Sequence, residues 1–264
     1  MKTAPHGRTT EVTVAAFEGD ESATKFDSVV TEEPLELRLV AGAQTHSLAV
    51  TMRTPGNDFE LAAGFVRNEQ IIRSAEELAG LTYCVDPEIN EEQRYNIVNV
   101  QLRAESLPSL ERFERHFTVN SSCGVCGRAN LEQLEELGLT PVEDEARVSI
   151  ETVYQLPKQM RKAQRIFSLT GGLHAAALFD LNGNTIALRE DVGRHNAVDK
   201  LCGWALIEKR SLQNTIMFVS GRASYEILQK AAVARIPIVC AVSAPSSLAE
   251  IGRASCRERV CLYV

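Results

Sequence analysis

Two cysteines separated by two residues, Cys123 and Cys126, have the clearest potential for chemistry in this chain. Their neighbours from 118 to 128 are mostly serine, glycine, asparagine and other small or polar residues, whereas buried structural cysteines usually sit among apolar side chains. The pattern predicts a loop that solvent can reach. Arg128 and a helix predicted to begin directly after it both favour a thiolate, because positive charge stabilises the anion. The loop therefore has the ingredients of reactive sulfur chemistry.

Four interpretations of this pair stay open on residue patterns alone. Structural zinc needs four ligands, and the candidates His116 and Cys84 do not have ligand-like spacing. A thioredoxin-type redox pair would follow a strand and open a long helix, which is not the pattern here. The two cysteines could be inert loop residues. The interpretation favoured by the composition of the loop is a nucleophilic thiolate that carries a group such as a persulfide.

A second candidate site lies at 191–196, between a predicted strand and a predicted helix. Loops at the carboxyl ends of strands that open a helix are where α/β sheets bind anionic ligands. Arg194 and His195 add side-chain donors that suit a phosphate. The alternative for this segment alone is a helix start with a solvated arginine.

The segment 220–224 repeats this arrangement at the end of another predicted strand. Gly221 lets the backbone approach a ligand closely, Arg222 can bind a phosphate through two donors, and Ser224 can cap the next helix. Gly221, Arg222 and Ser224 are therefore candidate cofactor-binding residues, with Arg194 and His195. A third strand-to-helix turn, at 243–247, is rich in hydroxyl groups and uncharged. Three such turns along one sheet predict a site for a phosphate or nucleotide.

The composition of the chain argues against several classes of protein. The chain has 264 residues, 44% of them apolar, and a net charge of −7, which argues against a general nucleic-acid or membrane-surface binder. No apolar run approaches the roughly 20 residues needed to span a bilayer, and the first residues lack the apolar core of a secretory signal. Seven cysteines at irregular spacing do not form a secreted disulfide framework, so a cytoplasmic location is expected.

The predicted fold class is α/β with an α+β N-terminal part. We expect an N-terminal α+β domain at 1–103, a connector with the CxxC loop at 104–148, and an α/β cofactor-binding domain at 149–250. In the first part the patterns predict one strand over 11–17 in an otherwise frayed start, a hairpin over 35–52, a helix capped by Asn57 or Asp58, and strands over 81–85 and 96–102.

The second part is predicted to contain a hairpin followed by alternating helices and strands, which implies a mixed sheet with helices on both faces. Pro157 suits the first turn of a helix that runs to about 169. His174 precedes an apolar strand and is interpreted as a satisfied core histidine. A zinc deaminase is rejected, because His174 is not followed by the required glutamate and the CxxC pair lies upstream of it.

Residues 251–264 resemble a translated sequencing adapter and are expected to be a non-native tail. They continue neither the preceding helical pattern nor a plausible last strand. We therefore expect the chain to be less stable than a homologue with a natural ending.

With these segments assembled, the chain resembles the formate dehydrogenase accessory sulfurtransferase family, FdhD. The stretches that carry the resemblance are SCGVCG at 122–127, TGGLHAA at 170–176, REDVGRHNAVDK at 189–200, SGRASYE at 220–226 and AVSAPSSLA at 241–249. They follow the order of the family from about residue 30 to 249. The long central stretches are far more specific than the CxxC pair.

The resemblance implies a function in molybdenum cofactor biosynthesis and formate dehydrogenase maturation. A member of the family would take persulfide sulfur from a cysteine desulfurase and pass it to the molybdenum (or tungsten) bis-pyranopterin guanine dinucleotide cofactor of formate dehydrogenase. Cys123 would bear the persulfide, and Cys126 would assist or relay. The second part would resemble a cytidine-deaminase-like domain without its zinc. A non-catalytic chaperone that binds this cofactor is the alternative, and the sequence leaves open whether the chain forms a homodimer.

Overall fold

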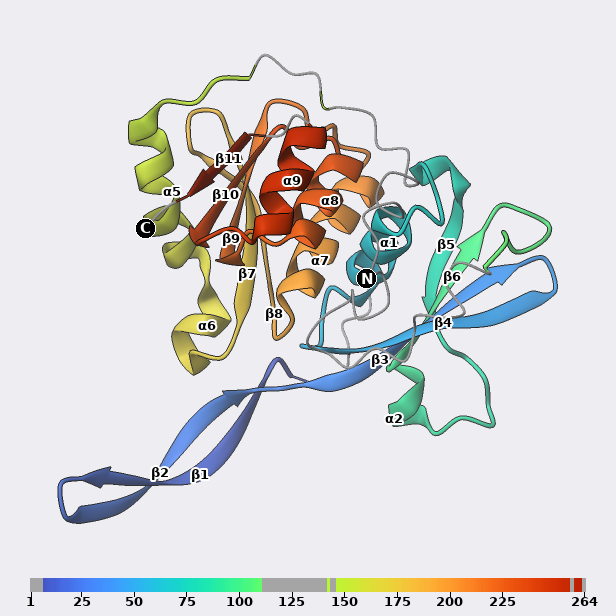
Figure 1. The fold of residues 1–264 in the computed structure, drawn as a ribbon. Helices are drawn as coiled ribbons and strands as arrows, with labels where there is room; N and C mark the ends of the chain where they lie inside the picture. Colours follow the sequence, from blue (N-terminus) through green and yellow to red (C-terminus); the bar gives the residue numbers. More distant parts are fainter. Residues whose placement is uncertain (1–6, 111–141, 143–145, 257–258, 263–264) are drawn as a thin grey trace.

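The computed structural model describes residues 7–110, 142, 146–256 and 259–262 of the chain (Figure 1). Its strands are β1 (Thr9–Glu18), β2 (Glu21–Val30), β3 (Glu33–Ala41), β4 (Gln44–Arg53), β5 (Leu78–Tyr83), β6 (Ile97–Leu102), β7 (His174–Asp180), β8 (Thr185–Asp191), β9 (Thr215–Arg222), β10 (Ile238–Ser243) and β11 (Arg259–Leu262). Its helices are α1 (Asp58–Asn68), the short 3-10 helix η1 (Ala75–Glu77), α2 (Glu91–Arg94), α5 (Ile150–Ala163), α6 (Arg165–Thr170), α7 (Arg194–Ile207), α8 (Tyr225–Val233) and α9 (Ser247–Cys256).

The N-terminal part is a sheet of order β4-β3-β6-β5 with α1 packed on one face. β3 and β4 form the predicted hairpin, and β6 lies parallel to β3 on its other side. Alternate residues of β3, among them Leu35, Leu37 and Leu39, are fully buried against α1, as the alternating pattern predicts. The expected α+β character of this part is confirmed.

The second part is a sheet of order β11-β10-β9-β7-β8. Ala176 and Leu178 of β7 face the core beneath α7 and α8, whereas Ala177 and Phe179 face the core beneath α5. Helices therefore cover both faces, and the predicted three-layer mixed sheet is confirmed (Figure 1). The likeness of this part to a cytidine-deaminase fold stays a prediction.

The two parts meet where α1 crosses α7. A Cβ atom added to Gly64 of α1 would lie 1.8 Å from the carbonyl oxygen of Asp199, and one added to Gly203 of α7 would lie 1.8 Å from the carbonyl oxygen of Glu60. Such distances leave no room for any side chain, so the two helices touch backbone to backbone. α1 thus packs against the first sheet on one side and against the second part on the other.

The start of the chain is more ordered than predicted. β1 and β2 form a two-stranded antiparallel ribbon that extends away from both sheets (Figure 1). The expected strand over 11–17 is part of β1, but the expectation that residues 1 to about 25 are otherwise frayed is wrong for residues 9–25. Gly19, with a φ of 62°, lies in the tight connection that turns the chain back into β2.

Two other local expectations are corrected. Pro157 does not lie in the first turn of its helix: α5 begins at Ile150, where the Ser149 hydroxyl accepts a hydrogen bond from the Thr152 amide, and Pro157 lies inside the helix. The tail does continue regular structure, since α9 extends to Cys256 and β11 pairs in parallel with β10. The open edge of β10 offers the backbone donors and acceptors that such a strand needs.

Substituting Gly64→Ala or Gly203→Ala tests the helix contact. Each added methyl would force the two backbones apart, and we expect the free energy of unfolding to fall by about 3 kcal/mol or more. Urea unfolding would measure this change. Gly80→Ala is the control, because its added carbon meets only the far end of the Gln101 side chain, at 3.0 Å. Equal stability of wild type and Gly64→Ala would contradict the contact.

Candidate functional site

The topology of the second sheet brings the predicted anion-binding turns to one edge. β7 is antiparallel to both β8 and β9, and β10 is parallel to β9, so the carboxyl ends of β8, β9 and β10 lie beside the amino end of β7. Along this edge Asp191 stands opposite His174, and Arg222 stands opposite Ser243. We call the residues 174, 191–195, 220–224 and 243 the edge row.

The turn after β8 is built around the carboxylate of Asp191, which is fully buried. Its Oδ1 accepts hydrogen bonds from the Gly193 amide at 2.8 Å and from Asn196 Nδ2 at 3.0 Å. Its Oδ2 lies 2.7 Å from Lys200 Nζ and accepts a hydrogen bond from the Thr54 amide at 3.2 Å. Because a buried carboxylate is costly without partners, this set fixes the backbone from which α7 starts.

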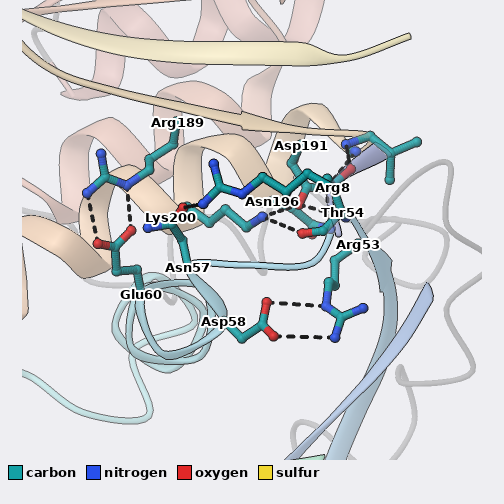
Figure 2. Close-up of polar contacts among 12 residues, drawn as sticks. Arg8, Arg53, Thr54, Asn57, Asp58, Glu60, Arg189, Asp191, Asn196 and Lys200 are labelled. Carbon is teal, nitrogen blue, oxygen red and sulfur yellow. Dashed lines mark hydrogen bonds and ion pairs between the residues drawn. The ribbon is translucent and has the colours of Figure 1, made fainter. Parts of the chain in front are cut away.

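Thr54, which follows β4 of the first part, holds this turn from three sides. Besides its amide, its hydroxyl accepts a hydrogen bond from the Val192 amide and its carbonyl accepts one from Lys200 Nζ at 2.8 Å. Asn196 also donates to the Met52 carbonyl at 2.7 Å. Figure 2 shows Lys200 and Asn196 converging on Asp191 and Thr54. The shape of the turn therefore depends on the N-terminal part.

The two residues before Asp191 are also tied to other elements. Arg189 donates to both carboxylate oxygens of Glu60 in α1, one of them at 2.8 Å (Figure 2). Glu190 accepts hydrogen bonds from the Ile166 and Phe167 amides at the start of α6. The end of β8 is thus anchored to α1 and α6 as well as to Thr54, which holds the following turn in one position.

Arg194 and His195 are the first two residues of α7, where the positive end of the helix dipole faces the edge row. His195 Nε2 lies 2.6 Å from Oε2 of Glu226 in α8. Burial alone would raise the pKa of Glu226, but the close contact with His195, together with the charges of His195, Lys230 and Arg194, outweighs burial and holds this pKa below its ordinary value. The predicted pair is therefore placed at the row, with a carboxylate beside His195.

The turn after β9 brings Gly221 next to Arg194. A Cβ atom at Gly221 would lie 3.5 Å from Arg194 Cδ, so the two predicted turns are in contact. The side chain of Arg222 is exposed, and among the described residues it makes no ion pair. Ser224 occupies the cap position of α8, but its hydroxyl makes no capping hydrogen bond, contrary to expectation. Its buried Oγ has no hydrogen-bond partner in the described part of the chain.

His174 is a residue of the row that the sequence reasoning missed. It was interpreted as a core histidine, but it is half-buried and stands between Asp191 and Gly221 at the start of β7. The signal lay in the hairpin itself: an antiparallel pairing of β7 with β8 puts position 174 beside the turn at 191.

The CxxC residues Cys123 and Cys126 lie outside the described residues, as does His116. The described cysteines of the first and second parts, Cys84, Cys202 and Cys240, are buried. Burial, with the nearby Asp199 carboxylate, raises the pKa of Cys202 to about 12, so this thiol stays protonated. Within the ranges that the structure describes, no three His, Cys, Asp or Glu side chains gather to hold a metal ion.

None of the helices in the described ranges is both long enough and apolar enough to cross a bilayer.

Comparisons with known proteins agree with these sequence patterns. The model of the FdhD/NarQ family matches residues 30–254. Similar curated proteins include "Sulfur carrier protein FdhD" of Mycolicibacterium paratuberculosis, 49% identical over 84% of this chain and 81% of the relative. The protein of the same name from Streptomyces avermitilis is 47% identical over 86% and 80%, and that from Sulfurisphaera tokodaii is 43% identical over 90% and 86%.

A solved structure shares the fold. The crystal structure of a protein described as a formate dehydrogenase accessory protein, from Desulfotalea psychrophila, superposes with a TM-score of 0.73 at 21% identity. The likeness covers 98% of this chain and 94% of that one.

The buried pair of Asp191 and Lys200 can be tested by a double-mutant cycle. Lys200→Met leaves an uncompensated buried carboxylate and should lower the free energy of unfolding by about 3–5 kcal/mol. Asp191→Asn should also destabilise, and the double variant should lose less than the sum of both losses. Urea unfolding provides the numbers. The part-exposed pair Arg38–Glu36 is the matched control, with an expected coupling of about 1 kcal/mol or less. Additive losses at Asp191 and Lys200 would refute the interaction.

The lowered pKa of Glu226 predicts a pH dependence of stability. A carboxyl group whose pKa is depressed by folding contributes stability above its ordinary value of 4.5, and loses it as the pH falls through the folded-state value. Replacing Glu226→Gln should therefore flatten the loss of stability of the protein below that pH, as followed by thermal melting. The exposed Glu208→Gln variant serves as the control. If the stability of Glu226→Gln falls with decreasing pH as steeply as that of the wild type, the pairing with His195 is contradicted.

Proposed function

The chain belongs to the FdhD/NarQ family, and on that premise we propose that it carries sulfur for the maturation of a formate dehydrogenase. The relationship to relatives named sulfur carrier proteins, at 42–49% identity over most of the chain, is the observation that carries the proposal. The matched residues include the CxxC pair. These names favour sulfur carriage over the alternative of a chaperone that only binds the cofactor.

Cys123 is the sulfur-bearing residue in this proposal. Its thiolate attacks the outer sulfur of a persulfide on the donor, a new S–S bond forms at Cys123, and the donor cysteine leaves as a thiolate. The donor chemistry fits a cysteine desulfurase. Cys126 assists or relays, because a second thiolate two residues away can attack the outer sulfur and take it over as a persulfide, while Cys123 leaves as a thiolate. At this level the activity is that of a sulfurtransferase.

The acceptor in this proposal is a molybdenum or tungsten bis-pyranopterin guanine dinucleotide, bound as a substrate. The edge row supports this choice because guanidinium groups bind phosphate oxygens through two parallel donors. Arg194 and Arg222 would hold the pyrophosphate, with His195 and the Ser224 hydroxyl as further donors. Gly221 has no Cβ that would fill the space beside Arg194. The persulfide then gives its outer sulfur to the metal, which supplies two electrons, and Cys123 returns as a thiolate.

A cytoplasmic location follows from the same chemistry. A free persulfide-bearing thiol needs a reducing compartment, since an oxidising one would trap the CxxC pair as a disulfide. The partners are then a cysteine desulfurase as donor and the formate dehydrogenase that receives the sulfurated cofactor.

Mass spectrometry of the intact chain tests the central step. After incubation with a cysteine desulfurase and cysteine, the protein should gain the mass of one sulfur atom, and peptide mapping should place it on Cys123. Cys123→Ala should abolish the gain and the formate dehydrogenase activity of a strain that depends on this protein. Cys84→Ala is the matched control, because it removes one buried thiol and leaves the loop intact. Full activity of the Cys123→Ala strain would instead support the chaperone.

A further inference from the structure

His174 lies among the residues to which the proposed function assigns the cofactor phosphates. It begins β7, the strand that separates β8 from β9 in the sheet. Its backbone pairs with Asp191 on one side, and its Nδ1 lies 3.8 Å from the position of a Cβ at Gly221 on the other. The same Cβ position lies 3.8 Å from Arg194 Cβ. The imidazole therefore occupies the row between the two arginine-bearing turns.

Ser220 orients this imidazole. The Ser220 hydroxyl oxygen accepts a hydrogen bond from the Ala175 amide at 2.9 Å, which leaves its own proton free to donate. Its Oγ lies 3.5 Å from His174 Nδ1, at the outer limit of a hydrogen bond. When Ser220 donates to Nδ1 of the neutral ring, Nε2 carries the ring proton. A neutral His174 is then already a donor for an anion.

The charges around His174 oppose its protonation while the row is empty. Burial lowers the pKa of His174, and the neighbouring charges of Arg194 and His195, both from α7, lower it further. Asp191 of β8 acts in the opposite direction, but its carboxylate is already paired with Lys200. On α8, Glu226 faces His195, and on β9 the flanking groups are Ser220, Gly221 and the exposed Arg222. The balance favours the neutral ring.

We propose that His174 is a further anion-binding residue of the edge row and that its imidazole takes up a proton when a pyrophosphate group binds there. The inference rests on the proposed binding of the dinucleotide cofactor at this row. An anion held beside Arg194 offsets the positive charge that disfavours an imidazolium at His174. The protonated ring then binds the anion as a charged donor, and its Nδ1–H turns toward the Ser220 oxygen.

The sign of the pH effect follows from linkage. A ligand that raises the pKa of a histidine binds more tightly at lower pH, since the bound state holds more protons. The affinity should rise as the pH falls below the bound-state pKa of His174, by at most about tenfold per pH unit for one proton. It should level off below the free-state pKa, which lies under the ordinary histidine value of 6.5. The cofactor is therefore held best when His174 is charged.

Titration calorimetry with diguanosine pyrophosphate tests the inference in the full chain. This probe consists of two guanosines joined through a 5′-pyrophosphate, and its phosphates do not titrate near neutral pH. Measured in buffers of different ionisation enthalpy, the wild type should take up a fraction of one proton on binding near pH 6.5. His174→Asn and His174→Gln should bind several-fold more weakly and lose most of that uptake. His46→Asn, in the first sheet, is the matched control and should behave as the wild type.

A second measurement uses only the wild-type protein, so it does not depend on whether a variant folds. The ring resonances of His174, followed by NMR in the wild type, should titrate at a higher pH with the probe than without it. Binding with an unchanged His174 titration, or with undiminished proton uptake in both variants, overturns the role of His174 and leaves the proposed function standing. Failure of the wild type to bind the probe at any pH overturns the proposed pyrophosphate site and this inference with it.

Discussion

The buried carboxylate of Asp191 is the interaction on which the edge row depends. Removing a carboxylate and an ammonium group from water costs several kcal/mol each, so the pair with Lys200 is stable only when every remaining hydrogen bond is made. Thr54, which belongs to the N-terminal part, supplies two of those bonds, one to each partner. The turn that presents Arg194 and His195 is therefore complete only when both parts of the chain are folded together. The predicted phosphate-binding residues of the second sheet thus depend for their position on a part of the chain that supplies none of them.

The contact between α1 and α7 also fixes the N-terminal part relative to this turn. Gly64 and Gly203 let the two backbones touch, so Thr54, which lies just before α1, has a fixed distance from the start of α7. Arg189 and Glu60 reinforce the same contact through paired charges. A rigid edge row suits the proposed function, in which sulfur on Cys123 and the cofactor must meet in one defined geometry for transfer. The N-terminal part thus contributes positioning.

Much of the fold follows from local patterns, and the failures have physical reasons. Alternating apolar residues predict β3 and β4. Arginines at the ends of strands predict the edge row, because the carboxyl ends of parallel strands meet at one edge of a sheet. His174 was missed because only the strand order β9-β7-β8 puts the amino end of β7 among those carboxyl ends. Thr54 carried no signal, since its role consists of backbone and hydroxyl contacts with residues far along the chain. Residue type alone favours Ser224 as the cap of α8, but its hydroxyl makes no capping hydrogen bond.

In the proposed function, Cys123 donates sulfur to an acceptor held at the edge row, and one transfer experiment tests that step. The protein would be loaded with radiolabelled sulfur on Cys123 and mixed with the purified guanine dinucleotide cofactor. The label on the cofactor would then be measured over time. The wild type should transfer the label rapidly, whereas an Arg194→Ala, Arg222→Ala double variant should be loaded normally but pass its label slowly. Equal transfer by both proteins would contradict the proposed function, because the acceptor would then not be held at the edge row.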